Sequence, residues 1–163
     1  MNTESIRILY DYSAWANRRI LDTTARLTPE QFLAEGGASY GSVRDTLVHT
    51  LSAQEVWLSR WKSAAPPTAL NAVDFPDLDA IRGRWERIEH DTSDFLTMLR
   101  DADRIVEYVN SKGERWAYPL WQQMLHQVNH ATQHRSEVAV LLTQFGHSPG
   151  ELDLLIYIDQ QNA

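Results

Sequence analysis

Three histidines in one segment are the strongest chemical signal in this sequence. His126, His130 and His134 follow one another at four-residue spacing. On a helix, residues four apart lie on the same face about one turn apart, so two such imidazoles can bind one metal ion. A third ligand must then come from elsewhere in the chain, and the candidate is His49. The proposed site therefore depends on how the fold brings residue 49 to this helix.

The angular positions of the three histidines separate them into two groups. At roughly 100° per residue, His130 lies about 40° and His134 about 80° from His126. Apolar residues occupy an arc of roughly 60° to 160° on the same helix, so His134 lies within this arc and His130 at its edge. His126 lies just outside the arc and is better suited to the rim of a site or to solvent. The predicted inward pair is His130 and His134.

Neutral imidazole is a ligand for zinc, nickel, copper and ferrous iron, and we expect a divalent ion, zinc or nickel first. The core of the segment reads His-Ala-Thr-Gln-His, which lacks the glutamate of the zinc protease motif His-Glu-x-x-His. The protease mechanism therefore does not transfer. His49 faces mostly inward on its expected helix, which favours a metal site. A bundle with buried histidines and no metal remains an alternative on this evidence.

Composition limits the class of protein. The chain has 163 residues, 43% of them hydrophobic, which fits a single globular domain over residues 1–163. A formal net charge of -7 argues against nucleic acid or an anionic membrane as partner. Because the sequence has no cysteine, any thiol chemistry needs an external low-molecular-weight thiol. The N-terminal residues have no apolar signal-peptide core and no later run is long enough for a membrane span, so we expect a cytoplasmic protein.

Hydrophobic periodicity predicts the elements that must position these residues. We expect an all-α fold, a four-helix bundle whose long helices span about residues 3–25, 43–62, 77–99 and 119–145. A capping box at Thr28 and Gln31 predicts a short helix that Gly36 and Gly37 end. The β-rich segment 104–118 predicts a small hairpin or an extended crossover before the fourth long helix. A short C-terminal helix is expected over residues 152–159.

Three polar residues on the expected helices could have structural or functional roles. Glu137 lies at about 20°, between His126 and His130, and is a candidate catalytic base or a carboxylate that orients a ligand. The alternative interpretation, a solvated surface acid, is the more common case for such a residue. Arg135, on another face, is predicted to pair with an acid where helices touch. Asn17 interrupts the apolar stripe of the first helix, either as a hydrogen-bonded core amide or beside a site.

Three segments of the chain together resemble the DinB (damage-inducible) family of the DinB/YfiT-like superfamily. They are Tyr12-Ser-Ala-Trp-Ala-Asn17, Leu47-Val-His49 with Trp57 downstream, and Val128-Asn-His-Ala-Thr-Gln-His-Arg135. The last is similar to the family signature Asn-His-x-x-x-His-Arg. The resemblance implies a metal site made by His49, His130 and His134, a four-helix bundle and a homodimer. Ser136 and Glu137 stand where Gly and Gln are common in the family.

Three neutral histidines would leave a divalent ion with its full charge and at least one open position. Water there would have a pKa lowered towards ~7, and an external thiol would be favoured as thiolate. The superfamily resemblance implies an enzyme that acts on a small-molecule substrate by thiol-dependent transfer or by hydrolysis. The rival hypothesis is a non-catalytic metal-binding stress-response protein in which the metal only ties two helices together.

Overall fold

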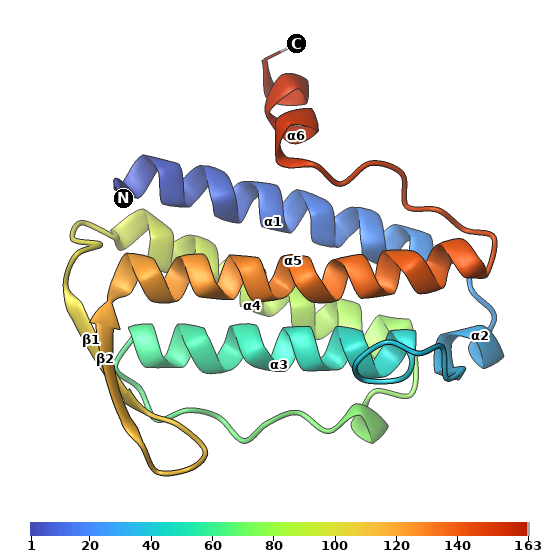
Figure 1. The fold of residues 1–163 in the computed structure, drawn as a ribbon, viewed down its shortest axis with the longest axis horizontal. Helices are drawn as coiled ribbons and strands as arrows, with labels where there is room; N and C mark the ends of the chain where they lie inside the picture. Colours follow the sequence, from blue (N-terminus) through green and yellow to red (C-terminus); the bar gives the residue numbers. More distant parts are fainter. Residues whose placement is uncertain (163) are drawn as a thin grey trace.

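Four long helices form the main body of the protein. The computed structural model describes residues 1–162, and the long helices are α1 (Thr3–Thr24), α3 (Val43–Trp61), α4 (Leu78–Met98) and α5 (Leu120–Gln144). The helix α5 packs against α1 and α3, and α4 packs against the same two helices from the other side (Figure 1). Each long helix therefore has two neighbours around a common core, which confirms the predicted all-α four-helix bundle.

Side-chain caps fix several of the helix starts. The Oδ1 of Asn2 accepts a hydrogen bond from a backbone N–H in the first turn of α1, at 2.8 Å, and the Oγ of Ser42 does the same for α3, at 3.1 Å. The short helix α2 (Pro29–Leu33) has the predicted capping box between Thr28 and Gln31. Each cap satisfies an N–H that the helix itself leaves without a partner.

The core is built from the apolar stripes of the four long helices. On α4, residues at three- and four-residue steps from Ile81 to Phe95 are buried, and Trp85 among them is 2% exposed. Trp61, near the end of α3, is 1% exposed and lies edge-on to Tyr10 of α1. The inward stripes of α3 and α5 also face this core. Any polar residue beside these stripes is therefore held in a fixed position.

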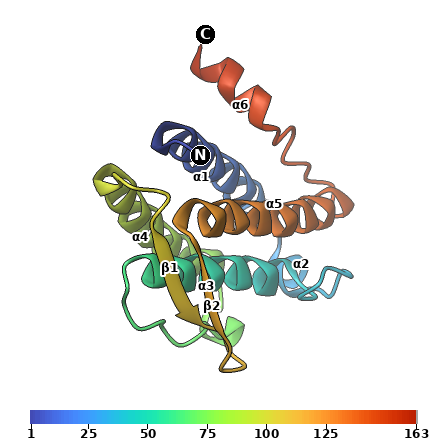
Figure 2. The same cartoon turned by 60° about the vertical axis from the view of Figure 1, so that its left-hand side comes forward.

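A two-stranded hairpin connects α4 to α5. The strands β1 (Ile105–Val109) and β2 (Arg115–Pro119) are antiparallel and β1 contacts α3 (Figure 2). The side-chain amide of Gln123 on α5 donates to the carbonyl of Val106, at 2.8 Å, and so fixes the hairpin to the bundle. Of the two predicted alternatives, hairpin or extended crossover, the structure has the hairpin.

Two further elements lie outside the bundle. A single 3-10 turn, η1 (Ala72–Asp74), lies in the connection between α3 and α4. The C-terminal helix α6 (Leu154–Gln161) projects away from the bundle and has no buried residue (Figure 1). None of the helices described here combines the length and apolar character needed to cross a lipid bilayer.

Candidate metal centre

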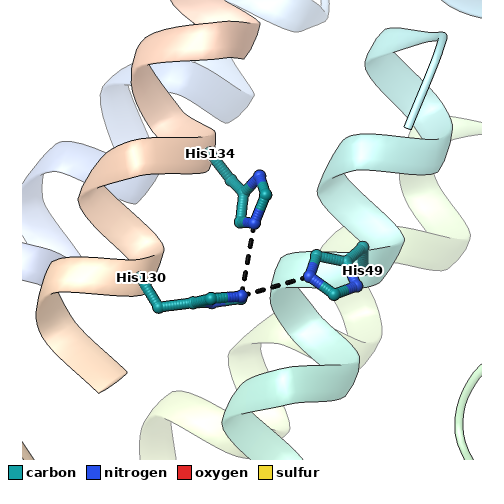
Figure 3. Close-up of side chains that lie close together, drawn as sticks. All are labelled: His49, His130 and His134. Carbon is teal, nitrogen blue, oxygen red and sulfur yellow. Dashed lines mark hydrogen bonds between the residues drawn. The ribbon is translucent and has the colours of Figure 1, made fainter. Parts of the chain in front are cut away.

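Three histidine side chains from two neighbouring helices meet at one point. His49 comes from α3, and His130 and His134 come from α5 (Figure 3). The Nε2 of His130 lies 3.2 Å from the Nε2 of His49 and 3.2 Å from the Nε2 of His134. One nitrogen of each ring lies within 4.8 Å of the other two. The fold therefore brings together the three residues that the sequence singled out.

The burial of the histidines on α5 follows their angular order. His134 is 4% exposed, His130 is half-buried and His126 is exposed. The ring of His126 packs edge-on against Trp57 at 5.2 Å, and its centroid lies 6.2 Å from that of His130. The predicted separation of an inward pair from an outer histidine is confirmed, and His126 lies at the rim of the cluster.

Glu137 fixes the orientation of His134. Its carboxylate accepts a hydrogen bond from the Nδ1 of His134 at 2.9 Å and another from the hydroxyl of Ser39 at 2.6 Å. Partial burial raises the pKa of Glu137, whereas these two hydrogen bonds lower it. The hydrogen bonds together have the larger effect, so the net shift of the pKa is downward. Because an ionised carboxylate only accepts, the Nδ1 of His134 must carry the proton. Its Nε2 therefore presents a lone pair to the cluster.

The contacts among the three Nε2 atoms cannot all be good hydrogen bonds. The Nε2 of a neutral His130 carries either one proton or one lone pair, so it can form a linear bond with only one of its two neighbours. A cation that accepts a lone pair from each ring would satisfy all three nitrogens. Nitrogen ligands around a tetrahedral zinc ion lie roughly 3.3 Å apart, given zinc–nitrogen distances of about 2.0–2.1 Å. The observed 3.2 Å separations fit such an ion.

The protonation states of two of the histidines also suit a metal. Burial, together with the nearby charges of the other histidines, lowers the pKa of His49 to about 4 and that of His130 to about 4. Both imidazoles are therefore neutral near pH 7, the form in which histidine binds metal ions. The buried Nδ1 of His130 has no hydrogen-bond partner among the described residues.

The loop between α2 and α3 adds two contacts that sequence reasoning missed. The ring of Tyr40 stacks on His49 with centroids 3.7 Å apart and lies edge-on to His134, while Ser39 holds Glu137. Gly37 and Gly41, at φ values of 80° and 83°, allow the turn that places these side chains. The glycines were a visible signal of a tight loop, but nothing local shows that the loop covers the histidines.

On the far side of α5, Arg135 forms no ion pair with an acid within residues 1–162, which corrects the prediction. Its guanidinium donates to Ser13 at 2.8 Å and to the Oδ1 of Asn17 at 3.1 Å. Asn17 in turn donates to the carboxylate of Glu89 at 3.3 Å. Arg135 is therefore connected to the acid Glu89 only through the side-chain amide of Asn17. Asn17 is 3% exposed, which confirms its interpretation as a hydrogen-bonded core residue.

Together, the fold and this cluster define an all-α bundle with a three-histidine group that fits a metal site. A model of the DinB family matches residues 1–163, and the chain belongs to that family. It is 20% identical over 157 residues to "Protein DinB" of Bacillus subtilis (strain 168), covering 92% of this chain and 91% of the relative. A conserved protein from Enterococcus faecalis has a similar fold, with a TM-score of 0.64 at 9% identity over 83% of this chain and 94% of that one.

Proposed function

We propose that the protein is a metal-dependent enzyme that acts on a small molecule by thiol-dependent transfer or by hydrolysis. His49, His130 and His134 would hold a divalent ion, zinc or nickel. The observation that supports this proposal is the convergence of three Nε2 atoms at 3.2 Å contacts that no protonation state of neutral histidines satisfies. When bound, such an ion acts as a Lewis acid and favours the deprotonated form of water or a thiol.

The chain's own residues prepare the site for that chemistry. Glu137 accepts the Nδ1 proton of His134 and so keeps the lone pair of Nε2 directed at the cluster. Tyr40 covers one face of the His49 ring and limits the approach of water from that side. Because the chain has no cysteine, a thiol substrate would have to come from outside the protein.

The number of candidate ligands supports an enzyme over a purely structural metal. Among the described residues, the group that could hold an ion contains three side chains and no fourth histidine or carboxylate. The nearest carboxylate, Glu137, is already engaged by His134 and Ser39, and the His126 ring packs on Trp57. Structural zinc sites have four protein ligands, whereas catalytic sites have three and one exchangeable position.

We also propose that the protein is cytoplasmic and forms a homodimer. Two observations support the homodimer. The family resemblance implies a dimer, and the exposed apolar residues of α6 offer a surface for a second copy. Leu155 is 70% exposed, and the helix buries none of its residues in the single chain. The ring of Tyr157 on α6 packs beside Tyr12 and Trp15 of α1, so α6 lies next to α1.

The first test is the metal content of protein purified without a histidine tag. We expect close to one divalent ion per chain. His49→Ala should weaken binding by more than about 100-fold, because even residues that only support a metal ligand contribute 10–100-fold. His90→Ala is the matched control, since His90 is exposed on α4 and remote from the cluster. Negligible metal in the wild type, unchanged in His49→Ala, would contradict the metal site.

A second measurement separates the enzyme from the structural alternative. In cobalt-substituted protein, added imidazole or thiol should change the visible spectrum if one position is exchangeable. A spectrum that neither ligand alters would favour a closed site that only ties α3 to α5.

A further inference from the structure

Arg60 lies between two aromatic rings near the end of α3. Its guanidinium carbon is 4.6 Å from the ring centroid of Trp57 and 4.2 Å from that of Tyr108 on β1. The two rings are themselves edge-to-face, 5.3 Å apart. Contact with two rings limits the positions that the guanidinium can take before any ligand arrives. Arg60 is therefore a preorganised cation.

This cation has no partner of opposite charge. Among residues 1–162, Arg60 forms no ion pair and no side-chain hydrogen bond, and its buried Nε has no acceptor. Its terminal nitrogens reach solvent. The chain has 22 acidic residues against 15 basic ones, so acids are in excess. The N–H donors of this half-buried arginine are therefore available to bind an anion from outside the chain.

Arg60 faces the same way as the metal cluster. At roughly 100° and 1.5 Å per residue, Arg60 lies about 20° from His49 around α3 and about 16 Å along its axis. Between them, the ring of His126 lies 6.2 Å from that of His130, and the ring of Trp57 lies 5.2 Å from that of His126. An unbroken row of rings therefore leads from the histidine cluster to the cation.

We propose that Arg60 binds an anionic group of the substrate, a carboxylate or a phosphate, while the reacting group of the same molecule lies at the three histidines. The body of the substrate would lie along Trp57 and His126. The terminal N–H groups of an arginine match both anions through paired hydrogen bonds. This inference rests on the proposed function and adds a substrate class to it: an elongated molecule with an anion at the end remote from the reaction.

A structural role for Arg60 is the competing explanation. Its stacking joins α3 to β1 and could serve only to fix the hairpin. In that case the guanidinium would show no saturable response to anions. The two roles can therefore be separated without knowing the natural substrate.

The first experiment uses the metal-free wild-type protein and follows the arginine Nε–H signals by NMR. The Arg60 signal is assigned by its loss in Arg60→Gln. Titration with hexanoate and with inorganic phosphate, against chloride at equal ionic strength, should shift this signal saturably. The signal of Arg82, a partly exposed arginine paired with Asp22, is the internal control and should show no saturable shift. Absence of a saturable shift at Arg60 for both anions would overturn the proposal, whether or not the protein binds metal.

The second experiment connects Arg60 to the cluster. Mercaptooctanoate, whose extended chain is long enough for the separation given above, should bind the cobalt-substituted protein at least about tenfold more tightly than neutral mercaptooctanol. This is the size of one charge-assisted hydrogen bond. Arg60→Gln should abolish this preference, and Arg82→Gln should leave it intact. Equal affinity of the two thiols in the wild type would overturn the substrate subsite while leaving the metal site standing. A protein that binds no metal, yet shows the NMR shift, would instead disprove the proposed function and retain Arg60 as an anion site.

Discussion

Glu137 touches the histidine cluster without belonging to it. The carboxylate contacts the Nδ1 of His134, on the side of the ring away from the other two histidines. A carboxylate in this position sets the tautomer of a metal-binding histidine and increases its basicity. We infer that Glu137 is a positioning residue. Its predicted role as a catalytic base has less support, because both its hydrogen bonds go to protein side chains.

Glu137→Gln tests this role. The amide has nearly the size of the carboxylate but no charge, so it no longer favours the required tautomer of His134. We expect the affinity for zinc to fall by about tenfold, measured by competition with a chromophoric chelator. Ser136→Ala, on the exposed side of the same helix turn, should bind zinc as the wild type does. Wild-type affinity in Glu137→Gln would show that the contact is incidental.

At the residue level, the sequence predicted what helical geometry alone determines. The angles placed His134 and His130 inward and His126 outside, and the burial of the three residues agrees. The stacking of Tyr40 on His49 could not be predicted, because it depends on where a nine-residue loop folds back on the bundle. Loop positions result from contacts between distant parts of the chain, which local patterns do not encode.

At the level of elements, two faces of α5 carry polar residues with different roles. One carries the histidines, and another carries Arg135, which is 4% exposed and hydrogen-bonded to Ser13 and Asn17 of α1. Through Asn17 the chain of hydrogen bonds reaches Glu89 of α4. Burial lowers the pKa of Arg135, but an arginine stays protonated in proteins. The hydrogen bonds to Ser13 and Asn17 therefore stabilise a buried positive charge. The network fixes the position of α5 in the bundle.

Arg135→Leu should destabilise the protein by about 2–4 kcal/mol, because it leaves the buried oxygens of Ser13 and Asn17 without their donor. Urea denaturation of the metal-free proteins gives the change in the free energy of unfolding. Arg26→Leu is the matched control, an exposed arginine just beyond the end of α1, and should change stability little. Equal stability of Arg135→Leu and the wild type would mean that the network contributes nothing to holding α5.

The elements themselves were largely predictable. Caps and periodicity located the long helices to within about two residues, because each signal acts over a single turn. The choice between hairpin and crossover required tertiary contacts such as that from Gln123 to Val106, which the sequence does not display. The direct partners of Arg135 were mispredicted for a related reason. Angular position shows which face a residue occupies, but not which side chains of the opposite helix meet it.

At the level of the whole molecule, two half-buried histidines make folding depend on pH. His49 and His130 have a pKa of about 4 in the folded protein, whereas a histidine in the unfolded chain titrates near 6.5. Between these values the unfolded chain binds more protons than the folded one, so stability rises with pH in this window. Stability is fully present above about pH 6.5 and falls as the pH drops towards about 4.

We therefore expect metal-free protein to be less stable at about pH 5 than at about pH 7, as measured by urea denaturation in the presence of a chelator. His49→Gln should show a shallower dependence, because one of the two depressed groups is gone. His90→Gln, which removes an exposed histidine, should keep the wild-type slope. Identical pH profiles for the wild type and His49→Gln would contradict the neutral, half-buried state of His49.

The separation of the proposed metal ligands along the sequence affects the entropy of the unfolded chain. His49 and His130 are 81 residues apart in sequence, and the segment between them contains α4 and the hairpin. An ion that joined them would act as a reversible cross-link closing a long loop. A covalent link over a loop of that length stabilises by about 4.5 kcal/mol through the lost entropy of the unfolded chain. A cell short of the metal would then lose the fold's cross-link together with its chemistry, so metal supply would control how long each folded copy survives.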